Sequence, residues 1–321
     1  MLCTTVIPTV DRPSLERAVK SAVEQEIDSD QHEIIVVNDS GKPLPDYHWL
    51  DHPQITIINT NQCERSIAQT MGAAVGKGKY IKILQDDDYL LPGGLKTLIE
   101  VGESSGCAWI YGSVNRIDNN GEFMSVNHAE VDGNVFGHSV VGDAFHLSGS
   151  LIRRDIFFEV GCFNPLINTS EDIDLQWRIA LAGCIARTTE IVAAIRVGVW
   201  GNTTTKWNKK TMDMRKVRES ALNAKGSFAR VRDSTKNDVG LRGRCCRAYL
   251  ISSILNLRSG KLGTTIDRGI KAVLLANFHV FNIKLWQGIL TRSYWHKYEM
   301  RKEVNHYKER YPDKDVKPQS W

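Results

Sequence analysis

Residues 80–92 read YIKILQDDDYLLP, an apolar run of strand length that ends in three consecutive aspartates and closes with a proline. A run of this kind is typical of a buried strand, and the polar residues after it form the turn at its carboxyl end. Asp86, Asp87 and Asp88 repel one another more strongly as water is excluded, so a cation would stabilise the cluster. Hard carboxylate oxygens favour Mg²⁺ or Mn²⁺, ions that also bind substrate phosphates. A solvated acidic turn at the start of a helix is the alternative interpretation.

The segments that precede this run predict an α/β sheet. Strands are predicted at 2–8, 33–37, 55–58 and 80–84. Helices are predicted after Ser14 and over 66–75, where apolar residues recur at helical spacing. Strands separated by helices are typical of a doubly wound, mostly parallel sheet. Ligands bind such sheets beyond the carboxyl ends of the strands, and Asp39 and Asp86 are predicted to lie there.

The charge is divided unevenly along the chain. The 321 residues carry a net charge of +4, yet residues 1–205 hold 15 Lys/Arg against 27 Asp/Glu, and residues 206–321 hold 26 against 10. This segregation predicts an α/β domain at 1–205 and a basic helical region at 206–321, with an antiparallel helix pair at 248–257 and 265–277. The basic region has no recognisable nucleic-acid-binding motif, so no nucleic-acid partner is predicted.

Composition and cysteine usage exclude several classes of protein. Hydrophobic residues make up 42% and charged residues 24%, as in ordinary globular proteins. The seven cysteines are odd in number and contain no CxxC pair, so we expect neither a disulfide framework nor a zinc site. Together with the lack of a leader-like start, this predicts a reducing, cytoplasmic compartment.

An apolar stretch at 272–286 bears on membrane contact. Asn277, His279, Asn282 and Lys284 interrupt it, so a spanning helix is not predicted. Its place in the basic region is compatible with peripheral contact at the inner, anionic face of a membrane. The alternatives are packing against the first domain or against a partner chain, which includes a homo-oligomer.

A second acidic pair begins the segment EDIDLQWRIA at 171–180. Glu171 and Asp172 would complement the dipole of a helix that Thr169 or Ser170 caps. The other interpretation is that one carboxylate is a general base for an acceptor hydroxyl. The residues alone leave both interpretations open.

Taken together, five segments resemble family 2 glycosyltransferases in order and spacing. They are residues 6–13, 33–41, 78–92, 146–164 and 171–178. The resemblance covers about residues 1–205 and implies a GT-A fold, a UDP- or dTDP-type sugar donor, Mn²⁺ or Mg²⁺, and inversion at the anomeric carbon. It also implies hexosyl transfer to a glycan or lipid-linked acceptor, in surface glycan or polysaccharide synthesis.

The resemblance assigns roles in donor binding. Pro8, Thr9 and Arg12 resemble the first nucleotide-binding turn, and Asp39 resembles the residue that hydrogen-bonds the pyrimidine base. Family members often have Ala-Arg-Asn where this chain has Ala-Gln-Thr at 68–70, so the arginine that helps hold the diphosphate is missing. Arg65, about one helical turn earlier, is the candidate replacement, beside the alternative of an exposed arginine at a helix start.

The resemblance also assigns the metal site and the base. Asp86 and Asp88 resemble the outer, metal-binding members of the aspartate triad, and Asp87 between them faces the donor sugar or ribose. Asp172 resembles the catalytic base, with Glu171 as the second candidate. In this chemistry the metal stabilises the leaving diphosphate while the base removes a proton from the attacking hydroxyl.

Two other classes of function compete with this interpretation. One is a catalytically idle protein that binds a sugar nucleotide or glycan, which the intact Asp86, Asp88 and Asp172 argue against. The other is a sugar nucleotidyltransferase, which would need a glycine-rich basic loop near the amino end. Residues 9–12, TVDR, contain no glycine.

Overall fold

The computed structural model describes residues 1–167, 169–197 and 207–290. The chain divides into two compact units, of which the first is Met1–Ser234 and the second begins at Thr235. The domain boundary expected near residue 205 lies outside the described residues. Helices α7 (Trp207–Asn223) and α8 (Ser227–Ser234) belong to the first unit, where they pack against α4 (Phe136–Val141) and α7 also against α6 (Glu171–Ala182).

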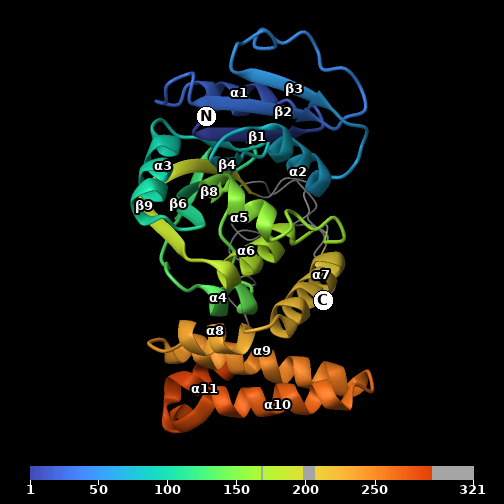
Figure 1. Cartoon of the computed structure of the whole chain (residues 1–321), viewed down its shortest axis with the longest axis vertical. Coiled ribbons are helices and arrows are strands. Elements are labelled where there is room, and N and C mark those ends of the chain that lie inside the picture. Colours follow the sequence, from blue (N-terminus) through green and yellow to red (C-terminus); the bar gives the residue numbers. More distant parts are fainter. Residues whose placement is uncertain (168, 198–206, 291–321) are drawn as a thin grey trace, which may run out of the picture. The chain divides into compact units, whose positions relative to one another are not determined.

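A nine-stranded mixed sheet forms the centre of the first unit (Figure 1). Its first half has the order β3–β2–β1–β4, and all these strands are parallel. The strands are β1 (Cys3–Thr9), β2 (His32–Asn38), β3 (Ile55–Asn59) and β4 (Tyr80–Ile83). They coincide with the four strands predicted from the sequence. The alternation of apolar strands with helices therefore predicted this half correctly.

The second half of the sheet contains antiparallel pairs. It continues the order with β8 (Ser150–Arg153), β6 (Trp109–Ile117), β9 (Ile185–Arg196) and β5 (Tyr89–Leu90), and β7 (Phe123–Asn127) pairs with β6. Strand β8 runs antiparallel to both β4 and β6, whereas β6 and β9 are parallel. The expected α/β fold with flanking helices is confirmed, and its sheet is mixed.

The helices that flank the sheet each bury one side against it. The remaining elements of the first unit are α1 (Leu15–Val23), α2 (Arg65–Val75), α3 (Gly94–Ser105), the 3₁₀ turn η1 (Leu147–Gly149) and α5 (Arg154–Glu159). In α1 the buried residues are Leu15, Ala18, Val19 and Ala22, the helical spacing that the sequence predicted. Strand β1 is buried along its whole length because it lies between β2 and β4.

The second unit is helical. It contains α9 (Val239–Arg258), α10 (Leu262–Ala276), the 3₁₀ segment η3 (Asn277–Phe281) and α11 (Ile283–Leu290). Helix α9 packs against both α10 and α11, so the predicted helix pair is present and longer than expected (Figure 1). A Cβ atom on Gly243 would lie 2.2 Å from the carbonyl oxygen of Leu285, so the close approach of α9 and α11 requires glycine there.

Membrane-spanning helices were not expected, and the structure agrees for the residues it describes. Within those ranges every helix is too short or too polar to cross a bilayer.

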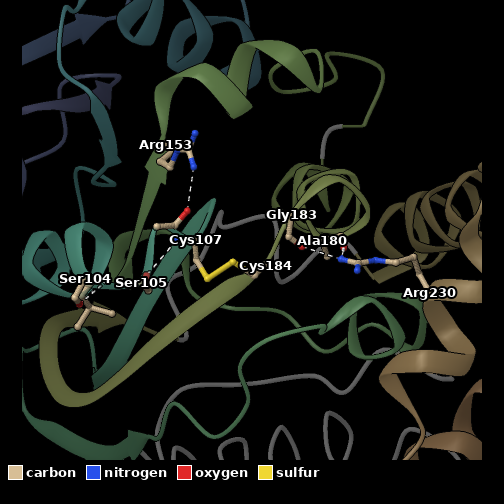
Figure 2. Close-up of a disulfide and its surroundings, with 10 residues drawn as sticks. Ser104, Ser105, Cys107, Arg153, Ala180, Gly183, Cys184 and Arg230 are labelled. Atoms are coloured by element: carbon tan, nitrogen blue, oxygen red, sulfur yellow. Dashed lines mark hydrogen bonds between the residues drawn. A yellow bond between two sulfur atoms is a disulfide. The ribbon is translucent and has the colours of Figure 1, made fainter.

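A disulfide joins Cys107 to Cys184 (Figure 2). The sequence predicted no disulfide framework, and it did not indicate this single bridge. Strands β6 and β9 begin to pair at Trp109 and Ile185, so the two cysteines directly precede neighbouring strands and their Cα atoms are 5.0 Å apart. They are 77 residues apart in the chain, and without knowledge of this strand pairing nothing brings them together.

Replacement of Cys107 and Cys184 by serine should lower the free energy of unfolding by about 2–4 kcal/mol, because the bridge closes a long loop in the unfolded chain. Urea denaturation of oxidised protein measures this difference, and reductant should bring the wild type close to the variant. Cys162→Ser, at a cysteine outside the bridge, is the matched control. Equal midpoints for the oxidised wild type and the double variant would contradict the bridge.

Candidate functional site

Three of the predicted site residues lie side by side at the carboxyl edge of the parallel strands. Thr9 is the last residue of β1, Asp39 follows β2 and Asp86 follows β4. The backbone N–H of Asp39 donates to the carbonyl of Thr9 at 2.8 Å. The hydroxyl of Thr9 donates to Oδ2 of Asp86 at 2.7 Å. Hydrogen bonds therefore connect the three strand ends into one continuous edge.

Pro8 also lies at this edge, as the penultimate residue of β1. It pairs in register with Val37 of β2, whereas the pairing of β1 with β4 ends at Val6. The missing N–H of a proline therefore falls beyond the last residue pair with β4. Pro8 is buried, and the loop that carries Arg12 begins after the next residue, Thr9.

Asp39 is buried and held as a hydrogen-bond acceptor. Its Oδ1 accepts from the hydroxyl of Thr60 at 2.7 Å and from the backbone N–H of Cys63 at 2.8 Å. Burial alone would raise the pKa of Asp39, but these hydrogen bonds outweigh it and hold the pKa below its ordinary value. The carboxylate is thus ionised at neutral pH. The loop after β3 supplies both donors, and the sequence had given no sign of this.

Arg12 bridges the first two aspartates of the triad. Its Nη1 lies 2.9 Å from Oδ1 of Asp86 and 3.2 Å from Oδ2 of Asp87. Burial raises the pKa of Asp86, and the guanidinium of Arg12 opposes that effect. The sequence placed Arg12 and the aspartates in one site, and the structure brings them into contact.

Asp88 is held from two segments that are distant in the chain. The hydroxyl of Ser148 in η1 donates to its Oδ2 at 2.5 Å, and the backbone N–H of Arg196 donates to its Oδ1 at 2.9 Å. Burial, followed by repulsion from Asp87, raises the pKa of Asp88 to about 7. Ser148 lies in a segment that carried the family resemblance, but no feature of the sequence had singled it out.

A buried lysine lies close to this aspartate. Lys82 in β4 has no exposed surface, and its Nζ donates to the carbonyl oxygens of Ser148 and Ser150, the latter at 3.0 Å. Burial lowers the pKa of Lys82 to about 7, while the charge of Asp88 acts in the opposite direction. A single lysine inside the apolar run of 80–84 was the signal that could have identified this residue.

Glu171 and Asp172 begin α6, and Arg65 begins α2. Nη2 of Arg65 forms an ion pair with Oε1 of Glu171. Burial raises the pKa of Glu171 to about 7, although Arg65 opposes this. The Oε2 atom of Glu171 is buried and has no hydrogen-bond partner among the described residues. The structure thus joins a predicted donor-binding residue to a predicted catalytic one.

Asp172 differs from Glu171 in its surroundings. It is half-buried, and its Oδ1 accepts from the adjacent N–H of Ile173 at 2.8 Å. Ser170 occupies the cap position of α6, but its hydroxyl makes no capping hydrogen bond. The more accessible carboxylate of the pair is therefore Asp172.

The fit of a divalent metal ion can be judged from these contacts. Among the described residues, no group of three or more His, Cys, Asp or Glu side chains is arranged to hold a metal ion. Thr9 and Arg12 engage the oxygens of Asp86, and Ser148 and Arg196 engage those of Asp88. The residues fit an ion held by one or two carboxylates and completed by water and substrate phosphates, the usual coordination of Mg²⁺. They do not fit an all-protein cage.

Comparison with known proteins identifies a family and a fold. The model of the family described as Glycosyl transferase family 2 matches residues 4–164, about half of the chain. The structure of S. aureus TarS 1–349 in complex with UDP-GlcNAc is similar with a TM-score of 0.62 and 11% identity, over 84% of this chain and 91% of that one. The same TarS fragment with UDP gives 0.57 and 12%, over 84% and 90%. No curated protein sequence matches the chain.

Asp88→Asn should stabilise the protein without metal at neutral and higher pH. Folding raises the pKa of Asp88 from 3.8 to about 7, so the folded state binds more protons than the unfolded state in this window. Stability from this group is present at low pH and is lost as pH rises from about 4 to 7. The variant lacks this loss and should gain about 1 kcal/mol or more at pH 8.

Denaturant unfolding in EDTA from pH 4 to 8 measures this effect, with the exposed Asp51→Asn as the control. The advantage of Asp88→Asn should grow with pH and level off above pH 7. A variant that is no more stable than wild type at pH 8 would show that ionised Asp88 is not disfavoured in the fold.

Proposed function

The chain belongs to glycosyl transferase family 2, and from this premise we propose that its site transfers a sugar from a nucleoside-diphosphate donor to a hydroxyl acceptor. The observation that carries the proposal is the hydrogen-bonded edge formed by Thr9, Asp39 and Asp86. It has an ionised carboxylate after β2 and an aspartate triad after β4, on either side of the end of β1, where α/β sheets bind their ligands. The structures of TarS with UDP-GlcNAc and UDP support a UDP-type donor for this chain.

In this proposal the donor extends along the edge of the sheet. Asp39 accepts a hydrogen bond from the pyrimidine N–H, a role that suits a carboxylate kept ionised by Thr60 and Cys63. Pro8 and Thr9 shape the turn beside it. Arg12 is half exposed and presents a planar guanidinium that can bind diphosphate oxygens. Asp87 faces the donor sugar or the ribose.

We further propose that Mn²⁺ or Mg²⁺ binds with the donor and that Asp88, with Asp86, holds it. When bound, such an ion neutralises charge on the leaving diphosphate. Asp88 suits this role because it is a buried carboxylate beside Asp87, and a cation would relieve the repulsion that raises its pKa. Lys82 positions Asp88 indirectly. Its ammonium group donates to the carbonyl of Ser148, and the hydroxyl of Ser148 donates to the carboxylate of Asp88.

Asp172 is proposed as the general base. It removes the proton of the acceptor hydroxyl, whose oxygen attacks the anomeric carbon as the bond to the diphosphate breaks on the opposite face. One displacement inverts the anomeric centre and needs no protein nucleophile. The acceptor we propose is a glycan or lipid-linked hydroxyl in polysaccharide synthesis.

Arg65 and Glu171 act as a pair in this scheme. Arg65 keeps Glu171 in place and favours its charged form. The ion pair engages Nη2 of Arg65, so the other N–H donors of this partly exposed guanidinium can bind the diphosphate, as the resemblance implied.

Donor binding is the first test of the proposal. UDP, UDP-sugars and dTDP are screened by thermal shift with and without Mn²⁺, and a ligand at a hundred times its Kd should stabilise the protein by about 2.7 kcal/mol. Asp88→Asn should lose the part of the shift that depends on Mn²⁺, whereas Asp51→Asn should keep it. Absence of a shift with every nucleotide would reject the donor site. An unchanged shift in Asp88→Asn would remove Asp88 from the metal site.

Turnover is the second test. Asp172→Asn keeps the size of the side chain but not its basicity, so release of UDP from the donor should slow by about 10²–10⁴-fold with donor binding unchanged. Glu171→Gln is the matched comparison on the same helix turn. A large loss in Glu171→Gln alone would move the base to Glu171. Donor binding without any release of UDP in the wild type would favour an idle sugar-nucleotide-binding protein.

A further inference from the structure

The second unit exposes an unusual amount of apolar surface. Of the 24 large apolar side chains exposed in the described part of the chain, 14 lie in α9, α10, η3 and α11. Those of the first unit are spread over some 230 residues, as is normal for a protein surface. Exposed apolar side chains concentrated in this way usually mark a contact with a partner or with a membrane.

One stripe of α10 accounts for much of this surface. Its members are more than half exposed and recur at helical spacing: Leu262, Ile266, Ile270, Val273 and Leu274. The buried residues of α10, which include Ala272 and Leu275, occupy other positions of the helix. Helix α10 thus has one apolar side packed inside the unit and a second apolar side exposed. We call the five exposed residues the α10 stripe.

The chain directly after α10 extends the stripe into an apolar corner, formed by Phe278, Phe281 and Ile283. Phe278 is 83% exposed and Phe281 is 93% exposed. Trp286 nearby donates its Nε1–H to the carbonyl of Val280 at 2.7 Å, which ties α11 to this turn. Two phenylalanines this exposed gain nothing from the fold of the unit itself.

The charges around this surface are almost all positive. Residues 235–290 contain nine Lys or Arg and two Asp or Glu. Asp238 caps α9 through the N–H of Leu241, and Asp267 pairs with Arg268 and Lys271. Both acids are therefore compensated within the unit.

Exposed cations flank the apolar surface along the chain. Arg258 and Lys261 precede the α10 stripe, and Lys284 follows the apolar corner directly. Lysine and arginine side chains at the edge of an apolar surface can reach charged headgroups while their stems cover apolar area.

We propose that the second unit docks on an anionic lipid bilayer through the α10 stripe and the apolar corner. Phe278 and Phe281 enter the boundary between headgroups and acyl chains, and Arg258, Lys261 and Lys284 contact lipid phosphates. The charge argues against a second copy as the occupant, because residues 235–290 of two copies, each with an excess of seven positive charges, repel each other. The proposal does not depend on the sugar donor or the acceptor.

Flotation of the full chain with vesicles tests this surface. Wild type should float with phosphatidylcholine vesicles that contain phosphatidylglycerol, and should do so more weakly at high salt and with phosphatidylcholine alone. Phe278→Ser/Phe281→Ser should reduce the bound fraction tenfold or more. Phe123→Ser in the first unit, at a phenylalanine that is 59% exposed, should bind like wild type. Thermal unfolding checks that each variant is folded.

A separate variant tests the contribution of positive charge to vesicle binding. Lys261→Gln/Lys284→Gln should weaken binding to anionic vesicles and leave binding to neutral ones unchanged.

Two results would overturn the proposal. One is the absence of binding to anionic vesicles at low salt, or binding that Phe278→Ser/Phe281→Ser leaves intact. The other comes from analytical ultracentrifugation without lipid. Self-association that Phe278→Ser/Phe281→Ser abolishes and Phe123→Ser preserves would assign the apolar surface to a second copy of the chain.

Discussion

A buried cation in the middle of a strand organises the site. Lys82 lies in β4, has no exposed surface, and satisfies its ammonium group with the carbonyl oxygens of Ser148 and Ser150. A buried polar group is tolerated only when it is hydrogen-bonded, and burial lowers the pKa of Lys82 to about 7 although the charge of Asp88 acts in the opposite direction. The ammonium thus ties β4 to the segment that leads into β8. Through the hydroxyl of Ser148 it also determines where the carboxylate of Asp88 lies.

The other carboxylates of the site follow the same rule. Arg12 compensates Asp86 and Asp87, and Arg65 compensates Glu171. Compensation is incomplete at Asp88 and Glu171, whose pKa values both rise to about 7 because burial disfavours their charged forms. Because the charged forms of both residues are disfavoured, added positive charge near Asp88 and added hydrogen-bond donors near Glu171 stabilise the site. The nucleotide sugar and cation that we propose as ligands would supply both.

The sequence predicted the elements that depend on local pattern. The four parallel strands, α1, α2 and the α9–α10 pair follow from apolar spacing, and Asp39 and Asp86 follow from their positions after strands. The sequence did not predict contacts between segments that are distant in the chain. The Arg65–Glu171 ion pair joins two helix starts about a hundred residues apart. The contact of Arg196 with Asp88 is made by a backbone N–H, so no residue type in the sequence could indicate it. The cysteine pair was missed for the same reason, because it depends on the parallel pairing of β6 with β9.

Strand β9 connects the disulfide to the aspartate triad. It begins one residue after Cys184 and ends at Arg196, the residue whose N–H holds Asp88. The disulfide therefore fixes the start of β9, and a hydrogen bond joins the end of β9 to the triad. Because successive strand residues face opposite sides, a residue gained or lost near the end of β9, with no bulge to absorb it, would turn the Arg196 N–H away from Asp88. Strand β9 already shifts register twice where it pairs with β6, so the register of its last residues, rather than its total length, decides whether the backbone reaches the triad.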